Sequence, residues 1–309
     1  MVVLAVMVAA GVLAAGIGWY ALGRWPSLDP GAPGGAVRAV GEQVREHETA
    51  QSGFVRHRLD PATTTGLALT LSIAIVVVGG AVLAALALLT RSNPTTLRID
   101  RGVANWAGTH ATDVSTAVLK GVTQLGSSLV VITLSVLLVV VVAATTHASR
   151  RRTVIMAAAY LTTVVAGQNL ISNVVKYAVD RARPNFHPLA GFSGPSFPSG
   201  HTCAAFACYC AFAVVLGRGR GPLRQRQLLA AALGIGAMVG ATRVLLGVHW
   251  LTDVLGGAAL GLAWFSLATI AFGGRLLRFG APVIAGERAA HLTEVVDDRA
   301  DVAGVSSTR

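Results

Sequence analysis

The chain has 309 residues, of which 53% are hydrophobic and only 13% are charged. Soluble domains carry about 25% charged residues, so this composition excludes an ordinary soluble protein and predicts one embedded in a bilayer. The formal net charge of +11 is compatible with a polyanionic partner or with a membrane protein whose inner loops are basic.

Apolar runs long enough to cross a bilayer, about 20 residues each, recur along the chain. The first, residues 1–22, lacks the basic start and the cleavage site of a signal peptide. We therefore expect an uncleaved N-terminal span, with a helix lying in the membrane interface as the alternative. Six further runs complete the prediction of an all-α integral membrane protein: 65–90, 128–147, 153–175, 201–217, 227–246 and 250–273.

Polar segments between these runs divide the chain into parts. Residues 91–127 are too polar to span and predict an outer loop with one amphipathic helix around Ile99–Trp106. The tail from about Ala281 contains no aromatic residue, so we expect it to be disordered and cytoplasmic. The predicted division is an N-terminal hydrophobic segment at 1–23, a polar connector at 24–63, a membrane domain at 64–275 and a tail at 276–309.

The positions of the basic residues argue against a nucleic-acid partner. If all seven runs span and the N-terminus lies outside, most of the 25 Lys and Arg residues lie on the inner side. This is the pattern of the positive-inside rule, which explains the net charge without a polyanion. We therefore expect no nucleic-acid binding and a multi-pass protein of the cell membrane.

Small residues within the runs have structural explanations. Three cysteines share one apolar run and are expected to pack as small hydrophobes, without a disulfide or zinc: Cys203, Cys208 and Cys210. Three glycines in the last run predict a face for close helix packing: Gly256, Gly257 and Gly261.

Three polar clusters lie at the outer ends of predicted spans and so converge on one membrane face. They occur within "KYAVDRARP", "SGPSFPSGH" and "TRVLLGVHWLTD", and their residues are Lys176, Arg183, Pro184, Pro198, Ser199, Gly200, His201, Arg243, His249 and Asp253. Each cluster alone has an ordinary explanation, such as basic side chains that snorkel to the interface or a structural histidine–carboxylate pair. Their convergence favours a shared site.

The basic residues of these clusters are suited to a phosphoryl group. Two arginine forks and one lysine can bind its oxygens. Ser199 occupies a predicted N-cap, and Gly200 lets the backbone approach a ligand. The free N–H groups of the helix that begins there complete an anion site.

The two histidines supply the chemistry that metal-free phosphoryl transfer requires. His249 and Asp253 are four residues apart, so the carboxylate can orient the imidazole. We therefore expect His249 to be the nucleophile. His201 has no carboxylate near it in sequence and is expected to be the general acid.

The three clusters, Lys-x6-Arg-Pro, Pro-Ser-Gly-His and Arg-x5-His-x3-Asp in that order, resemble the signature of the type 2 phosphatidic acid phosphatase (PAP2) superfamily. The resemblance covers about residues 64–275 and implies a six-helix transmembrane core, to which the N-terminal span would be an addition. One departure is Thr242, where the family usually has Ser; threonine retains the hydroxyl.

The resemblance also implies roles for individual residues. Lys176, Arg183 and Arg243 would hold the phosphate oxygens, and Ser199 and Gly200 would add hydrogen bonds. His249 would form a phosphohistidine, Asp253 would orient it, and His201 would protonate the leaving oxygen. No metal or other cofactor is implied.

The expected function is a metal-independent membrane lipid phosphatase or diphosphatase with its active site on the extracytoplasmic side. Phosphatidic acid, phosphatidylglycerol phosphate and undecaprenyl diphosphate remain open as substrates, and the oligomeric state is also open. Three alternatives are a vanadate-type haloperoxidase, an anion-binding transporter and, least favoured, a metal-dependent hydrolase. The apolar spans argue against the first, the scarcity of ionisable residues within them against the second, and the lack of further ligands against the third.

Overall fold

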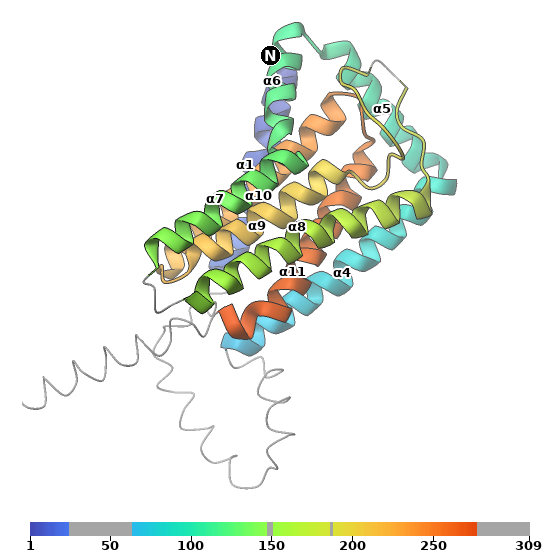
Figure 1. Ribbon diagram of the computed structural model, residues 1–309. Helices are drawn as coiled ribbons and strands as arrows, with labels where there is room; N and C mark the ends of the chain where they lie inside the picture. The colour runs from blue at the N-terminus through green and yellow to red at the C-terminus, as the bar shows by residue number, and fades with distance from the viewer. Residues whose placement is uncertain (25–63, 147–150, 186–187, 277–309) are drawn as a thin grey trace, which may run out of the picture.

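The computed structural model describes residues 1–24, 64–146, 151–185 and 188–276 (Figure 1). The predictions for the connector at 24–63 and the tail at 276–309 fall almost entirely outside these ranges. Within them the elements are all helical: α1 Val2–Arg24, α4 Thr64–Ser92, α5 Pro94–His110, α6 Asp113–Thr123, the short 3-10 helix η3 Gln124–Gly126, α7 Ser128–Thr145, α8 Arg151–Val179, α9 Gly200–Gly217, α10 Pro222–Leu245 and α11 Leu251–Leu276.

Seven of the described helices are long and apolar enough to cross a membrane: α1, α4, α7, α8, α9, α10 and α11. Large apolar side chains project from their outer faces, among them Leu129, which is 76% exposed, and Leu170, which is 67% exposed. Such surfaces are unfavourable in water and suit contact with lipid. The prediction of an all-α, multi-pass membrane protein is confirmed.

Helix α9 is the most buried of these spans and packs against α8, α10 and α11 (Figure 1). The outer helices are arranged around this group, with α1 against α10, α4 against α11 and α7 against α8. A central position for α9 suits its sequence, which is rich in small Ala and Cys residues with a few aromatic rings.

Glycines on α11 allow it to approach α9 closely, as the sequence predicted. A Cβ at Gly257 would stand 2.6 Å from the carbonyl oxygen of Ser199, and one at Gly261 would stand 2.6 Å from that of Cys203. Any side chain at these positions would therefore push the two helices apart. Because Ser199 and Asp253 lie at adjoining ends of α9 and α11, this contact fixes the two ends of the site together. The three cysteines are buried and free, as expected.

The N-terminal helix α1 is an integral part of the helical body. It packs along α10 so closely that a Cβ at Gly11 would lie 2.4 Å from the side chain of Met238. Near its other end the guanidinium of Arg226 stacks 3.8 Å from the ring centroid of Trp19 and donates to the Trp19 carbonyl. The predicted extra N-terminal helix is therefore present and packed on the core.

The segment between α4 and α7 contains more structure than the single helix predicted around Ile99–Trp106. Asn93 caps α5 by accepting hydrogen bonds from the N–H groups of Thr95 and Thr96, and Pro94 fits the first helical position. A second helix, α6, begins at a capping box formed by Thr112 and Ser115. The prediction of one helix was wrong because this second start signal was overlooked.

Candidate active site

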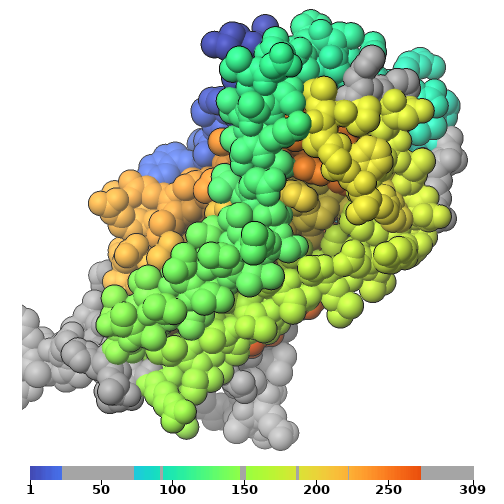
Figure 2. Space-filling view, turned by 45° about the horizontal axis from the view of Figure 1, so that its top comes forward, coloured from blue at the N-terminus to red at the C-terminus, as the bar shows by residue number. Residues whose placement is uncertain are grey.

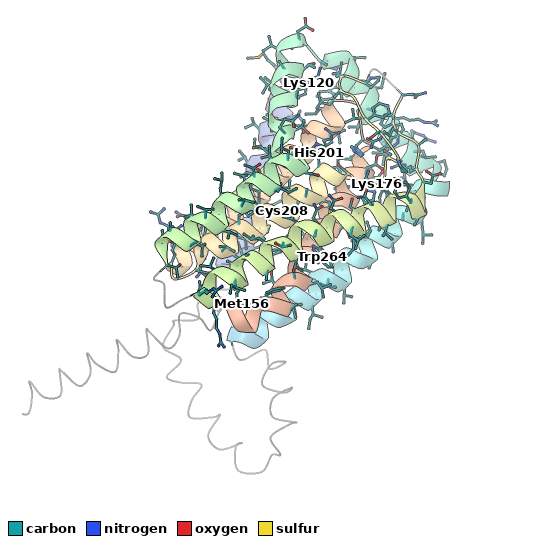
Figure 3. All side chains as sticks on the ribbon, viewed as in Figure 1. Lys120, Met156, Lys176, His201, Cys208 and Trp264 are labelled. Atoms are coloured by element: carbon teal, nitrogen blue, oxygen red, sulfur yellow. The ribbon has the colours of Figure 1, made fainter. Side chains whose placement is uncertain are left out.

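The three predicted clusters meet at one end of the bundle. They occupy the C-terminal end of α8 with the loop that follows, the N-terminus of α9, and the end of α10 with its connection to α11. Lys176 and His201 lie in this half of the molecule, far from Met156 at the other end of α8 (Figure 3). Figure 2 shows the surface hollowed between α6, in green, and the loop before α9, in yellow.

His249 is held in a tight connection between α10 and α11. Gly247 has a φ of +65°, a left-handed conformation that favours glycine, and the His249 N–H donates to the Arg243 carbonyl at 3.2 Å. The side chain is 2% exposed, and its Nε2 lies 3.1 Å from Nη1 of Arg183. Since a guanidinium can only donate, Nε2 accepts, and the ring proton is assigned to Nδ1.

The orienting carboxylate lies on the other side of the imidazole. Nδ1 of His249 is 3.4 Å from Oδ2 of Asp253, so the carboxylate faces this nitrogen without being aligned as a hydrogen bond. Oδ2 of Asp253 also accepts from the Trp250 N–H at 2.8 Å and from the Ser196 hydroxyl. The imidazole thus has its proton toward the carboxylate and its lone pair toward the basic residues, as a histidine nucleophile requires.

Burial lowers the pKa of His249 to about 4; the Asp253 carboxylate opposes this effect, and the charges of Arg183 and Arg243 add to it. At neutral pH the imidazole is therefore unprotonated. Its Nε2 lone pair carries no proton, and it can attack an electrophile once the hydrogen bond from Arg183 is released.

Arg183 and Lys176 hold the loop before α9. Arg183 donates to the carbonyl oxygens of Ser193, Gly194 and Pro195 at 2.9, 2.9 and 3.2 Å, and to that of Val248 at 2.8 Å. Lys176 Nζ donates to the Pro195 carbonyl at 3.0 Å. Their predicted role as phosphate ligands stays a prediction, and it requires that an anion replace some of these carbonyl contacts.

Arg243 has a hydrogen-bond donor that no described residue satisfies. It is 6% exposed, its Nη1 donates to the Thr123 hydroxyl at 3.1 Å, and its Nε has no hydrogen-bond partner. A buried cation with an unpaired donor is costly, and an incoming anion would relieve that cost. Thr123 was not predicted from the sequence because it lies far from the three clusters, at the end of α6.

The N-terminus of α9 forms the floor of the site. Ser199 is the N-cap residue, as predicted, although its side chain makes no cap hydrogen bond and its Oγ instead accepts from the Thr202 hydroxyl. A Cβ at Gly200 would lie 3.7 Å from Cε of Lys176, so the backbone there faces the basic residues. His201 is half-buried in the first turn, near enough to Arg243, His249, Lys176 and Arg183 for their charges to act on it.

A separate open hollow of about 560 Å³ lies beside this site, lined by Thr90, Leu97, Asp100, Arg101, Arg181, Ala182, Asn185 and Trp250. Neither histidine lines it, so the contacts of His249 and His201, and not this hollow, locate the chemistry. Among the described residues, no group of three or more His, Cys, Asp or Glu side chains is placed to hold a metal ion.

The fold is that of an integral membrane protein with a cluster of basic and histidine side chains at one end of a helical bundle. The chain belongs to the PAP2 superfamily, whose family model matches residues 157–276. The matched region runs from the middle of α8 to the end of α11 and so includes all three clusters.

Characterised relatives share this region. Phosphatidylglycerophosphatase B of Bacillus subtilis (strain 168) is 40% identical over 106 residues, covering 34% of this chain and 52% of that protein. A lipid A 1-phosphatase of Rhizobium johnstonii is 38% identical over 118 residues, covering 35% of this chain and 43% of that protein. These relatives are named as phosphatases, that is, phosphoric ester hydrolases. The chain spans about half the length of the curated relatives it matches.

A solved structure extends the likeness over most of the membrane domain. The crystal structure of a transmembrane PAP2-type phosphatidylglycerolphosphate phosphatase from Bacillus subtilis matches with a TM-score of 0.59 and 30% identity. The match covers 66% of this chain and 98% of that one. The resemblance found in the sequence is thereby confirmed.

Proposed function

We propose that the protein is a membrane lipid phosphatase that removes a terminal phosphate from a lipid phosphomonoester or diphosphate without a metal. The observation that carries this proposal is the contact between Nε2 of His249 and Nη1 of Arg183, 3.1 Å apart. In this proposal the imidazole nitrogen would be the nucleophile and the guanidinium would bind phosphate, and their contact supports both roles at one point. The names of the relatives support a lipid as the bearer of the phosphate. Among the three open substrates, the Bacillus subtilis proteins favour phosphatidylglycerol phosphate.

The proposed reaction has two steps. Nε2 of His249 attacks phosphorus, the bond from phosphorus to the lipid oxygen breaks, and that oxygen takes a proton from His201. A water molecule then gives its proton to His201 and attacks the phosphohistidine, which releases inorganic phosphate and restores both histidines. The cations of Arg183, Arg243 and Lys176 would stabilise the charge on the phosphoryl oxygens throughout.

The substrate itself would favour the acid form of His201. Three cations, Lys176, Arg183 and Arg243, lie near this imidazole. A bound phosphate would place negative charge beside His201, and a nearby negative charge favours the protonated, imidazolium form. His201 would therefore be protonated most readily when the phosphate of the substrate is bound.

The side of the membrane on which the site lies can be tested with introduced cysteines, because the three native cysteines are fully buried. In the proposed topology of the cell membrane, Phe192→Cys in the exposed loop before α9 should react with an impermeant thiol reagent on intact cells. Arg220→Cys, in the turn between α9 and α10 at the opposite end of the bundle, should be protected until the cells are opened. Labelling of Arg220→Cys alone would contradict an extracytoplasmic site.

Arg183→Lys is expected to be a damaging substitution. Lysine retains the charge but loses the fork that can grip two phosphate oxygens and also loses the donors to the loop carbonyls. Loss of one charge-assisted contact costs about 1.5–3 kcal/mol, which corresponds to roughly a 10- to 150-fold fall in kcat/KM. Wild-type kinetics in this variant would mean that Arg183 has no part in binding phosphate.

The pH dependence should reflect the low pKa of His249. Protonation removes the Nε2 lone pair, so activity is lost as the pH falls through about 4 and not through the ordinary histidine range near 6.5. The measurement is kcat/KM against pH, corrected for ionisation of the lipid phosphate. An acid limb near 6.5 would mean that a different group carries the reaction.

The proposed function is tested by phosphate release from purified protein in detergent micelles with excess EDTA. The panel would contain phosphatidic acid, phosphatidylglycerol phosphate and undecaprenyl diphosphate. We expect turnover of at least one of them, undiminished by EDTA. Halide oxidation with added vanadate, without any lipid phosphate hydrolysis, would instead support the haloperoxidase alternative.

A further inference from the structure

A buried acid outside the predicted clusters is linked to the site. Asp100 on α5 is 1% exposed and lies on the same helix face as the buried residues Ala104 and Ala107. A carboxylate there is unfavourable unless it is fully paired. It accepts hydrogen bonds from Nη2 of Arg181 at 2.7 Å, and from the N–H and hydroxyl of Thr252 at 3.1 and 2.6 Å.

Arg181 connects this acid to the orienting carboxylate. Its Nη2 binds Asp100 while its Nη1 binds Oδ1 of Asp253 at 2.6 Å and the Thr252 hydroxyl at 2.7 Å. The Arg181 and Asp100 side chains are 8% and 1% exposed, so solvent screens neither ion pair strongly. One guanidinium thus bridges two buried carboxylates.

We propose that Asp100 and Arg181 are positioning residues for the reaction at His249. Arg181 fixes Oδ1 of Asp253, so that Oδ2 is directed toward Nδ1 of the imidazole. Asp100 in turn fixes Arg181 from the side away from Asp253. This inference rests on the proposed function, because it assigns these residues to the same hydrolytic step.

The order of charges gives Asp100 a second effect. As His249 attacks, its imidazole becomes positive, and Asp253 stabilises that charge. Arg181 alone would draw the Asp253 carboxylate away from the imidazole and neutralise it. With Asp100 present, the side chains of Asp100, Arg181 and Asp253 together carry one net negative charge. The charges then alternate along the chain of contacts: negative on Asp100, positive on Arg181, negative on Asp253 and positive on the reacting imidazole.

A purely structural role for Asp100 makes a different prediction. The hydrogen bonds from Thr252 to Asp100 connect α5 to the first turn of α11. If Asp100 were only structural, loss of these bonds would reduce the fraction of correctly folded protein. The folded molecules that remained would react at the normal rate. The amount of active protein and its rate constant must therefore be measured separately.

A rapid-quench experiment with a short-chain ³²P-labelled lipid phosphate makes this separation. The burst amplitude counts active sites, and the burst rate constant reports the attack by His249. We expect Asp100→Asn to slow the rate constant by about 10-fold or more, as for other groups that orient a reacting side chain, with little loss of amplitude. Asp113→Asn, an exposed acid in the first turn of α6, is the matched control and should behave as wild type.

Thr252→Val keeps the test decisive if Asp100→Asn does not fold. Valine has nearly the same shape but lacks the hydroxyl that both Asp100 and Arg181 contact, and it changes no charge. A slower rate constant at normal amplitude supports the proposal. A normal rate constant with reduced amplitude in the variants overturns it.

A readout without substrate separates this inference from the proposed function. The ¹⁵N NMR shifts of His249 distinguish a ring with its proton on Nδ1 from one with its proton on Nε2. We expect the Nδ1–H form in both the wild type and Asp100→Asn, because Arg183 keeps Nε2 an acceptor. We expect a changed Nδ1 shift in the variant, because the Asp253 carboxylate beside that nitrogen is no longer held in place. An unchanged Nδ1 shift in that variant would overturn the positioning role, whereas an inactive wild type would reject only the proposed function.

Discussion

Replacement of His249 by alanine is expected to abolish phosphate release. The side chain provides the lone pair that attacks phosphorus, and among the described residues no other unprotonated nucleophile is paired with both Arg183 and a carboxylate. Loss of an enzyme nucleophile lowers kcat by on the order of 10⁴- to 10⁶-fold. Activity on a lipid phosphate and on an activated aryl phosphate should fall alike, since attack at phosphorus is common to both.

A matched histidine controls for general effects of this substitution. His110 lies at the end of α5, exposed and stacked on Trp106 with ring centroids 4.8 Å apart. His110→Ala should retain wild-type kinetics. If His249→Ala retained substantial turnover of the aryl phosphate, the assignment of the nucleophile would be wrong.

Replacement of His201 by alanine is expected to give a loss that depends on the leaving group. A lipid alkoxide leaves poorly and requires a proton, whereas a nitrophenolate leaves readily without one. The variant should therefore lose most activity on a lipid monophosphate and retain much more on nitrophenyl phosphate. The differential should be about 10²- to 10⁴-fold, the usual contribution of general acid catalysis.

The two substrates must be compared on one preparation, with kcat/KM measured for each. Equal losses on both would reject the acid role and leave His201 as a phosphate ligand or part of the helix terminus. A selective recovery on nitrophenyl phosphate by His249→Ala instead of His201→Ala would reverse the two assignments.

The membrane architecture was largely predictable because a span is a local property of sequence. A run of about 20 apolar residues identifies a transmembrane helix without knowledge of its neighbours. Close helix packing by the last span was also predicted, because Gly257 and Gly261 are marked by their small size alone, but the sequence did not identify α9 as the partner. The sequence did not predict that α9 is the central helix, since every span is apolar and only packing distinguishes a protein-facing helix from a lipid-facing one.

The site was predictable where its residues lie at the ends of spans in order along the chain. Lys176, His201 and His249 could be brought together from topology alone. Asp100 could not, because its partners Arg181 and Thr252 are more than 80 and 150 positions away and no local pattern links them. Arg183 was predicted to be a phosphate ligand, and that role stays a prediction. Its bonds to the carbonyls of the loop before α9 could not be predicted, because they depend on the folded path of that loop.

The central claim is a covalent phosphoryl transfer to His249 without a metal. It is tested most directly by mixing the wild-type protein with a ³²P-labelled lipid phosphate in EDTA, quenching within the first turnover and mapping the label by mass spectrometry. The account predicts an acid-labile, alkali-stable phosphoryl group on His249. Turnover of the lipid with no labelled histidine, or with label on a residue other than His249, would contradict it.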